Sequence, residues 1–580
     1  MPSHVWKYFT RSSDKTSATC NLCDKQFAYK GTTSNLLNHL NIQHPSANTT
    51  NDTPKKQVPM TSFLNSPRKT KTDSDRITQA IADMIVADYV PLSIVEGEGF
   101  RNLMSIVAPD YTVPCRKTVR TRIQRRYDVE REALTSELSE VKSASITTDT
   151  WTSNSTESFI TVTEHHVTDA WELKSNVLLT RAMPERHTGE NLANRLKDSV
   201  REFNLKGKVD TCVHDNARNM DCAGNMCDEW GDLGCFGHTL QLCLKPAMEL
   251  TAVSKVVAKC RKLVGHFKHS TTLTAEMGVR QKAMAVPQHS LVQDVPTRWN
   301  STYGIMARLV EQRRVLTDIL LDTAFTKRAD AAFNLKESEW TLISELCTVL
   351  KPFATITEYM STESSVSVSE IYPIVCGLVN KRLAPSADDS SIASKVKEAI
   401  KDELVRRYEP ESDDASQSTA ALGALLDPRY KKLVFFSSTQ RKLTHSELES
   451  RMDELPLRLP SGSKSDDCVT PAKRRKLDFL DFGSPDNAMQ DELHAYISKK
   501  PAAEVDPLEW WRENERRFPT VAVVAKSVLC VPATSVPSKR IFSSSGLLLN
   551  KLRNRLSSDI VDCIIFLNKN KVNVVATKDD

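Results

Sequence analysis

The spacing of hydrophobic and polar residues changes character near Ser145, where short stretches rich in Ile, Val, Thr and Phe begin. Three such stretches, at 144–153, 158–167 and 171–183, predict consecutive β-strands. An amphipathic helix is predicted over 189–203 and a further strand over 208–215. Strands followed by a helix and another strand indicate an α/β sheet.

Helical spacing dominates the chain on both sides of this sheet. Before it, apolar residues on one helical face predict a helix that begins at Asp75 and ends near Pro91, and a second helix covers about 114–140. After about residue 235 the chain is mostly helical to roughly 455, and a last compact helical block covers about 504–570. Between these parts, polar segments at 45–74 and 459–488 contain too little apolar surface to fold, so we expect disordered linkers there.

Composition is that of an ordinary globular protein. The 580 residues exceed what one core supports, and 40% hydrophobic with 26% charged residues is typical of folded chains. No apolar run reaches the ~18 residues of a membrane span, and the N-terminus has no apolar signal core, so we expect neither a membrane partner nor secretion. The 14 cysteines are scattered, which favours reduced thiols in the nucleus or cytosol.

Two cysteines and two histidines near the N-terminus have the spacing of a zinc site. Cys20 and Cys23 are separated by two residues, and His39 and His44 follow about one helical turn apart. A Cys-x2-Cys turn and two histidines on one helix face supply the four tetrahedral ligands of Zn²⁺. Because so small a unit has little core of its own, zinc would drive its folding.

The stretches VWKYF, CNLCDKQF, TSNLLNHL and IQH resemble the BED zinc finger family, which implies a ββα-like finger that binds double-stranded DNA. The finger helix is expected to begin near Thr32 or Thr33, either of which can cap it. If the first ligand histidine sits as in ordinary Cys2His2 fingers, one threonine and two asparagines face the bases, while lysines meet phosphate. These expected DNA contacts are Thr32, Asn35, Asn38, Lys25 and Lys30.

The predicted helix over 114–140 has a run of basic residues without an intervening acid. A solvated helix face and a phosphate-contacting face explain such a run equally well. The candidate DNA contacts in this helix are Arg116, Lys117 and Arg120.

Two aspartates end strands of the predicted sheet: Asp149, in ITTDTWTS, and Asp215, in VHDNARNM. Paired carboxylates can hold divalent metal for phosphoryl transfer, although each alone is more often a helix cap. The motifs DTWTS, HDNARNM, CFGHTLQL, DVPTRWNSTY, DPLEWWREN and VPSKRIFSSSG occur in this order, and with them the chain from about residue 75 resembles the hAT transposase family. The resemblance implies a multidomain α+β protein, with an RNase H-like α/β fold interrupted by a large all-helical insertion.

The same resemblance implies a catalytic triad of two aspartates and a glutamate, to which Asp149 and Asp215 correspond. Where the family has glutamate in a Ser-Glu-Arg context, this chain has Lys539, between Ser538 and Arg540. An ammonium group beside a divalent ion costs on the order of several kcal/mol even at an effective dielectric of about 20. We therefore predict that the transposase chemistry is lost and that the three residues are vestigial.

Two further family motifs are present, Cys235 with His238 and Arg298 with Trp299. By spacing alone, Cys222, Cys227, Cys235 and His238 could form a second zinc site, although cysteines in cores are common without metal. In an active relative Trp299 would stack on DNA, and the alternative is a core aromatic residue.

The last helical block resembles the hAT dimerisation domain, which implies a homodimer, and packing within one chain is the alternative for its apolar residues. These residues include Val521, Val524, Val528, Leu529, Leu547, Leu548, Leu552, Ile560, Ile564 and Leu567. The preceding polar stretch contains the run Lys473, Arg474, Arg475 and Lys476, a candidate signal for the nuclear import machinery.

These patterns predict seven segments: a zinc finger at 1–48, a linker at 49–74, a helical region for DNA binding and assembly at 75–140, the first part of the sheet at 141–252, the helical insertion at 253–458, a linker at 459–503 and a dimerisation domain at 504–572. The leading hypothesis is a nuclear, dimeric, sequence-selective DNA-binding protein that acts in transcription. The alternatives are an active hAT-type transposase and, from resemblance alone, a SUMO ligase-like activity, for which we find no RING-like array of cysteines and histidines.

Overall fold

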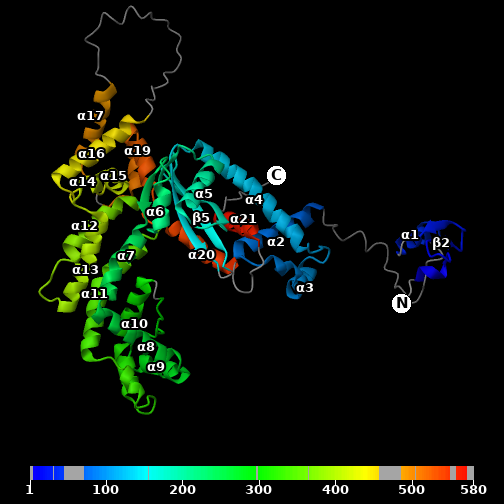
Figure 1. Cartoon of the computed structure of the whole chain (residues 1–580), viewed down its shortest axis with the longest axis horizontal. Helices are drawn as coiled ribbons and strands as arrows, with labels where there is room; N and C mark the ends of the chain where they lie inside the picture. The colour runs from blue at the N-terminus through cyan, green and yellow to red at the C-terminus, as the bar shows by residue number, and fades with distance from the viewer. Residues whose placement is uncertain are drawn as a thin grey trace, which may run out of the picture. The chain divides into compact units, whose positions relative to one another are not determined.

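The computed structural model describes residues 4–29, 32–44, 71–153, 156–295, 298–362, 365–455, 485–502, 504–548 and 557–570. The chain divides into two compact units, Met1–Asp73 and Ser74–Asp580, which we treat separately (Figure 1). The run Lys473 to Lys476 and most of the linker expected at 49–74 lie outside the described residues. None of the described helices has the combination of length and apolarity needed to cross a membrane.

The first unit is a small antiparallel sheet packed against one helix. A short 3-10 helix, η1 (His4–Lys7), precedes strands β1 (Phe9–Arg11), β2 (Ser17–Cys20) and β3 (Gln26–Ala28), and helix α1 (Ser34–Gln43) follows. The strands lie in the order β1-β2-β3, so the finger has one strand more than the ββα pattern implied. Its core is small and consists of Val5, Phe9, Ala18, Cys20, Leu36 and Leu40.

The second unit is built around a five-stranded sheet in the order β6-β5-β4-β7-β8. Strands β4 (Ala144–Thr152), β5 (Ser158–Val167) and β6 (Leu173–Ala182) pair antiparallel, while β7 (Val209–His214) runs parallel to β4. Helix α5 (Gly189–Glu202) makes the crossover between β6 and β7. The predicted strand-strand-strand-helix-strand order is confirmed, and the structure adds β8 (Gly231–Gly234), paired parallel to β7.

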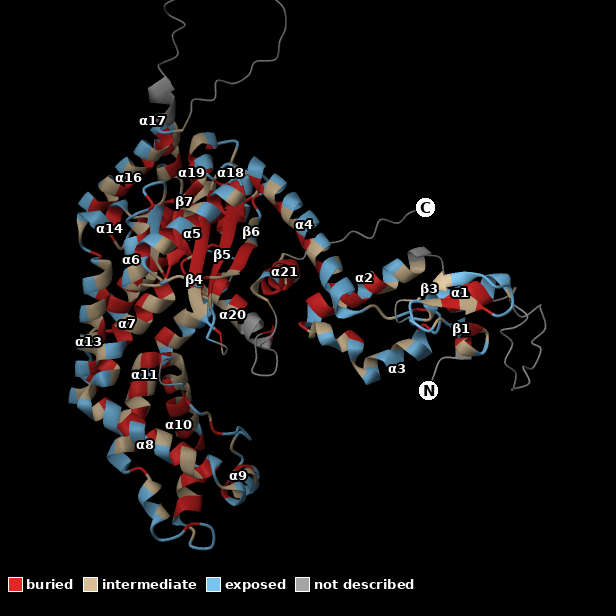
Figure 2. Cartoon of the chain, turned by 45° about the vertical axis from the view of Figure 1, so that its right-hand side comes forward, coloured by how far each residue is buried: buried red, intermediate tan, exposed pale blue. Residues whose placement is uncertain are grey.

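Alternate residues of β4 face two different helical layers. Ile146 packs in a core with Leu192 and Leu196 of α5. On the other face, the Ser145 hydroxyl donates to the Cys530 carbonyl at 3.1 Å, and the hydroxyls of Thr147 and Ser538 lie 2.6 Å apart. The sheet is therefore covered on both faces, and Figure 2 shows its strands buried beneath helices whose outer surfaces are exposed.

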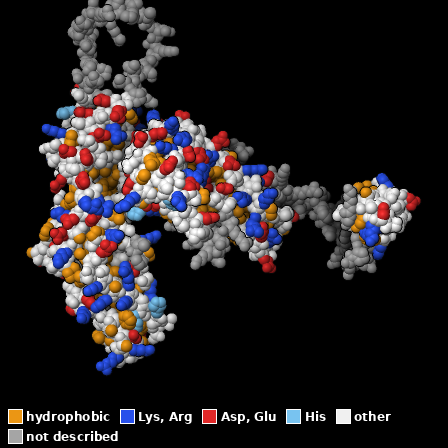
Figure 3. Space-filling model, in the orientation of Figure 1, with side chains coloured by type: hydrophobic (Ala, Val, Ile, Leu, Met, Phe, Trp, Pro, Cys, Tyr) orange, Lys and Arg blue, Asp and Glu red, His pale blue; other side chains and the backbone are white. Residues whose placement is uncertain are grey.

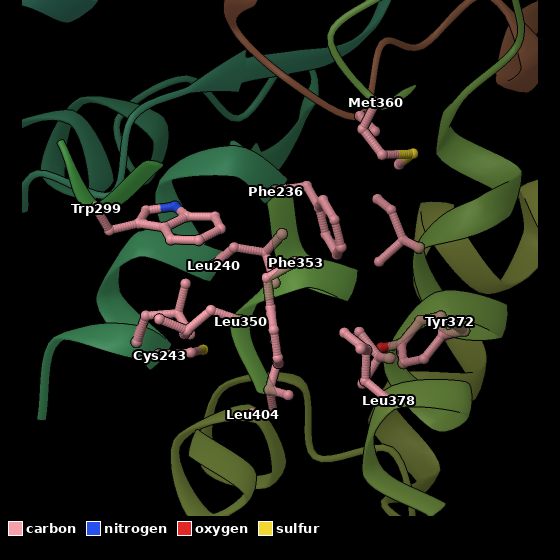
Figure 4. Packing of buried hydrophobic residues seen from close by; sticks show 14 of the residues in the cluster. Phe236, Leu240, Cys243, Trp299, Leu350, Phe353, Met360, Tyr372, Leu378 and Leu404 are labelled. Atoms are coloured by element: carbon pink, nitrogen blue, oxygen red, sulfur yellow. The ribbon is translucent and has the colours of Figure 1, made fainter. Parts of the chain in front are cut away.

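Helices make up the rest of this unit. Before the sheet lie α2 (Lys71–Asp88), η4 (Leu92–Glu96), α3 (Glu98–Val107) and α4 (Arg116–Glu140). After β7 come α6 (Arg218–Gly224), α7 (Phe236–Glu249), α8 (Thr251–Lys268), α9 (Thr271–Ala283), α10 (Trp299–Leu321), η5 (Asp330–Phe333), α11 (Glu337–Tyr359), η6 (Val368–Glu370), α12 (Ile371–Gly377), η7 (Leu378–Arg382), α13 (Ser391–Tyr408), α14 (Asp413–Gln417), α15 (Thr419–Leu426) and α16 (Ser438–Asp453). The predicted all-helical region is thus present, and Figure 4 shows Phe236 and Leu240 of α7 packed near Phe353 of α11 in its core.

The C-terminal segments complete this same unit. They form α17 (Pro485–Ser498), α18 (Pro507–Asn514), α19 (Pro519–Leu529), α20 (Val536–Leu548) and α21 (Ser558–Lys569). We expected a linker over 459–503, but helix α17 lies within this range. The helix is held in the fold because Tyr496 is fully buried and stacks on Trp511 at 5.3 Å between ring centroids. The indole of Trp511 also stacks on Trp171, with 5.7 Å between ring centroids, and Trp171 lies in the turn between β5 and β6. The C-terminal segments therefore pack against one end of the sheet.

Candidate metal centre and sheet-edge cleft

The four predicted zinc ligands converge in the first unit. Cys20 ends β2, Cys23 lies in the turn before β3, His39 lies in α1, and His44 is the C-cap residue that follows α1. One ligand atom from each residue lies within 4.8 Å of the other three, and Cys23 Sγ is 3.3 Å from His39 Nε2. Among the described residues this is the only cluster of three or more Cys, His, Asp or Glu side chains arranged to hold a metal ion.

The chemistry of these donors fits zinc. Burial lowers the pKa of His39, and nearby His44 and Lys25 lower it further, which favours the neutral imidazole that binds metal. The Nε2 atom of His44 is buried without a hydrogen-bond partner among the described residues, as expected for an atom reserved for a metal. Two thiolates and two imidazoles at these distances match a closed structural zinc site.

The expected base contacts lie on the exposed surface of the finger. Helix α1 begins at Ser34, with Thr33 at the N-cap position but without a hydrogen bond from its side chain to the helix. Asn35 and Asn38 are exposed and one turn apart on α1, whereas Thr32 is exposed just before the helix. Lys25 is exposed as well, and Lys30 lies outside the described residues.

Salt bridges partly neutralise the basic helix α4. Arg116 and Arg120 are exposed, but Arg116 Nε pairs with Glu96 at 2.8 Å and Arg120 donates to the Ser557 hydroxyl at 2.8 Å. Lys117 is exposed, and no ion pair joins it to a described acidic residue. Acidic and basic side chains are interspersed over much of the face seen in Figure 3. The phosphate-contacting interpretation of α4 therefore stays a prediction that rests mainly on Lys117 and Arg120, because no ion pair joins either of them to a described acidic residue.

The two strand-end aspartates lie side by side at one edge of the sheet. In the parallel pair of β4 and β7, Thr147 is opposite Val213. Two residues further along both strands, this register brings Asp149 next to Asp215, and their charges influence each other. Asp149 is only 5% exposed, so its carboxylate needs a compensating charge.

Lys539 supplies that charge. Helix α20 places its Nζ atom 3.7 Å from Asp149 Oδ2 and 3.1 Å from His238 Nδ1, to which the ammonium group donates. The pKa of Asp149 is raised to about 6, mainly by burial and also by the Asp215 charge, while the Lys539 charge lowers it. Burial and Lys539 together lower the pKa of His238, which keeps this imidazole neutral as an acceptor. A cation fixed to the protein thus lies next to the buried Asp149 carboxylate.

The remaining family motifs surround a cleft of about 690 Å³ next to these charges. His238 and Trp299 line the cleft, and Trp299 is only 8% exposed because it also packs in the helical core (Figure 4). Arg298 is exposed at its rim. The buried Cys235 sulfur accepts a hydrogen bond from the Ser535 amide at 3.2 Å, and it belongs to no metal-binding cluster among the described residues. The second zinc site suggested by spacing is therefore not supported.

Three further residues of the cleft lie within the motifs DTWTS and VPSKRIFSSSG, but no sequence pattern assigns them to one site. Trp151 and Phe542 lie 5.5 Å apart between ring centroids and form one wall, and Arg540 donates to the Ser361 carbonyl at 2.8 Å on another side. These residues come from β4 and α20, which are nearly 400 positions apart (Trp151 to Phe542). No short motif could have joined them.

Comparison with known proteins agrees with this architecture. Residues 3–45 match the BED zinc finger, 147–230 the ZBED1 RNase-like domain, 233–349 the ZBED1 RNase-like helical domain and 492–571 the hAT family C-terminal dimerisation region. The chain is 25% identical to Zinc finger BED domain-containing protein 4 of Homo sapiens, over 98% of its own length but only 52% of the human protein. It is also 25% identical to Putative AC transposase of Zea mays, over 97% of this chain and 75% of that protein. Putative transcriptional regulator tpeD of Talaromyces stipitatus is 23% identical over 83% of this chain and 60% of the fungal protein.

Proposed function

Because the chain joins a BED zinc finger to ZBED1-type RNase-like domains and an hAT dimerisation region, we propose that it is a nuclear, zinc-dependent, sequence-selective DNA-binding protein. It descends from an hAT transposase, has lost the transposase chemistry and regulates transcription as a homodimer. The observation that carries DNA binding is the convergence of Cys20, Cys23, His39 and His44, because this site holds the finger in its folded form.

The exposed face of α1 supports the proposed selectivity. Asn35 and Asn38 are free to present amides to base edges, where asparagine pairs well with adenine. Lys25 is exposed on the same small unit and is the proposed phosphate contact. One finger contacts few base pairs, so two fingers on a dimer would raise both affinity and specificity. The run Lys473 to Lys476 is the proposed import signal.

The loss of chemistry rests on Lys539. Two-metal phosphoryl transfer requires anionic ligands on both sides of the metals. In this chain the third position carries an ammonium group 3.7 Å from Asp149, which repels a dication instead of binding it.

A second candidate, an active hAT-type transposase, is favoured by one observation: Asp149 and Asp215 still lie together at the sheet edge. The relative named as a transposase is consistent with either candidate, since both descend from the same ancestor. A strand-transfer assay with Mg²⁺ or Mn²⁺ separates them. We expect no product from the wild-type protein, and cleavage that disappears in Asp149→Ala would establish the second candidate.

The DNA-binding proposal is tested with Cys23→Ser, using Cys115→Ser as the matched control because Cys115 is an exposed thiol outside the finger. Sequence selection from a random DNA pool should yield an enriched motif with the wild-type and the control protein. The Cys23→Ser protein should lose its bound zinc and at least tenfold in affinity for that motif. Equal affinities of both variants would refute the proposal.

A further inference from the structure

A second large groove lies in the helical part of the chain, between α11 and the segment formed by α12 and η7. Its volume is about 730 Å³, and it shares no lining residue with the sheet-edge cleft. Its lining includes Lys351, Pro352, Ile356, Ile374, Lys381 and Arg382. Nothing in the proposed DNA-binding or ancestral catalytic chemistry uses it.

The floor of the groove is apolar. Pro352 and Ile356 come from α11, and Pro373 and Ile374 from α12, and all four remain partly accessible at the surface. Leu378 lies beneath them, buried in the helical core (Figure 4). Accessible apolar side chains gathered in a concave site can take up the apolar side chains of a ligand.

The rim of the groove is strongly basic. Lys351, Lys381 and Arg382 are exposed, and no ion pair joins any of them to an acidic side chain among the described residues. The lining contains no aspartate or glutamate. This differs from α4, whose arginines are largely paired with acids. The three cations are therefore available to a ligand with negative charges.

The backbone of the groove is irregular on both sides. Pro352 lies inside α11 and has no N–H to donate to the Thr348 carbonyl, one turn earlier at the groove wall. On the opposite wall η7 is a π-helical turn, in which the Leu383 amide donates to the Leu378 carbonyl at 2.9 Å. Such turns occur often at functional sites, because they re-aim side chains and backbone groups.

From these features we infer that the groove binds an acidic, amphipathic peptide segment of a partner protein. Leucine or phenylalanine side chains of the peptide enter the apolar floor, and its aspartates or glutamates pair with Lys351, Lys381 and Arg382. A nucleic-acid strand would use the cations but not the aliphatic and proline floor, which has no aromatic residue on which a base could stack. The inference goes beyond the proposed function: it gives a DNA-bound protein a surface for recruiting a second protein.

The test measures fluorescence anisotropy of a synthetic twelve-residue peptide, in which aspartate alternates with leucine and phenylalanine, titrated with the full chain. We expect saturable binding that weakens as salt rises. The double variant Lys381→Glu/Arg382→Glu should weaken it at least tenfold. Its matched control, Lys255→Glu/Lys262→Glu on α8, changes the net charge equally at two exposed lysines outside the groove and should bind like wild type.

A second variant fills the groove without changing its charge. A Cβ atom added at Gly377 meets no heavy atom within 4 Å, and this residue is helical, so Gly377→Leu should fold normally and block the floor. It should also weaken the peptide at least tenfold.

The inference would be overturned by unchanged peptide affinity in both groove variants, or by equal binding of a peptide with serine in place of leucine and phenylalanine. It would also be overturned if a single-stranded oligonucleotide displaced the labelled peptide at a lower concentration than unlabelled peptide does. Cys23→Ser should leave peptide binding intact, so the groove and the proposed DNA-binding function fail or succeed separately.

Discussion

Replacing Lys539 with glutamate tests whether its ammonium group keeps metal out of the sheet-edge cleft. Lys539 Nζ lies 3.7 Å from Asp149 Oδ2, and at an effective dielectric of about 20 two unit charges at this distance attract by about 4.5 kcal/mol. The Lys539 side chain is 32% exposed, so solvent screening reduces the attraction to a fraction of that value. In Lys539→Glu the interaction changes sign, and Asp215 adds to the repulsion.

The three carboxylates of this variant need either protons or a cation. Burial already raises the pKa of Asp149 to about 6 with Lys539 in place. Without the ammonium group and with a new carboxylate beside it, this pKa should rise by at least about one unit, which corresponds to about 1.4 kcal/mol. A divalent cation relieves the same repulsion, and hard cations such as Mn²⁺ prefer oxygen ligands.

The assay is calorimetric titration of the zinc-loaded full chain with Mn²⁺ at pH 7. We expect at least tenfold tighter binding by Lys539→Glu than by the wild-type protein. Lys539→Met, which removes the positive charge without adding a carboxylate, should fall between them, and Asp149→Asn/Lys539→Glu should return to the wild-type affinity. If the wild-type protein binds Mn²⁺ as tightly as Lys539→Glu, then Lys539 does not exclude metal, and the case for lost chemistry fails.

Three other predictions follow from single features. Removal of zinc by a chelator should unfold the finger and abolish its DNA binding while helicity measured by circular dichroism changes little, because the second unit contains most of the helices. The pKa of Asp149 is raised from 3.8 to about 6, so the stability that this group confers below pH 4 should be lost as pH rises through 6. In urea titrations the free energy of unfolding of the wild type should fall by about 3 kcal/mol relative to Asp149→Asn over this range. Parallel pH profiles of the two proteins would contradict this prediction. Trp511→Ala should destabilise the second unit by about 3–5 kcal/mol, because the fully buried indole stacks on two rings and donates to the Leu426 carbonyl at 2.8 Å. Urea titration measures this loss of stability, and a loss below about 1 kcal/mol would contradict the packing argument.

The strands of the sheet could be predicted because their residue types carry a local signal. Strands β4 and β5 are long and rich in β-branched residues, and β6 is also long, with the apolar run Val177, Leu178 and Leu179 at its centre, so their positions follow from composition and length. Strand β8 has the sequence Gly-Asp-Leu-Gly and no β-branched residue; it is a strand only because β7 offers it a parallel edge. Helix α17 was missed for a similar reason, since its burial depends on Trp511, which follows later in the chain.

Of the two candidate sites, the metal centre could be predicted from local sequence, whereas the sheet-edge cleft could not. Cys20, Cys23, His39 and His44 lie within 25 residues of one another, so spacing alone defines the metal centre. The sheet-edge cleft depends on contacts between residues hundreds of positions apart, such as the one between Lys539 and His238. The resemblance to hAT transposases pointed to position 539, but the imidazole that accepts from its ammonium group required the structure.

The C-terminal block shows why a family label for dimerisation does not locate an interface. Val521, Val524 and Val528 of α19 are buried in the core that this helix shares with the helical part of the same chain. Ile560 and Ile564 of α21 are buried against β6 and α4. The structure thus supports packing within one chain, which is the alternative that the sequence left open for these apolar residues. A deletion of residues 492–571 would therefore uncover part of both faces of the sheet, and the loss of dimers that it caused would report unfolding instead of a lost interface. If each chain keeps this fold in the dimer, contacts between two chains use side chains that remain exposed in one chain, and substitutions of such residues test the homodimer.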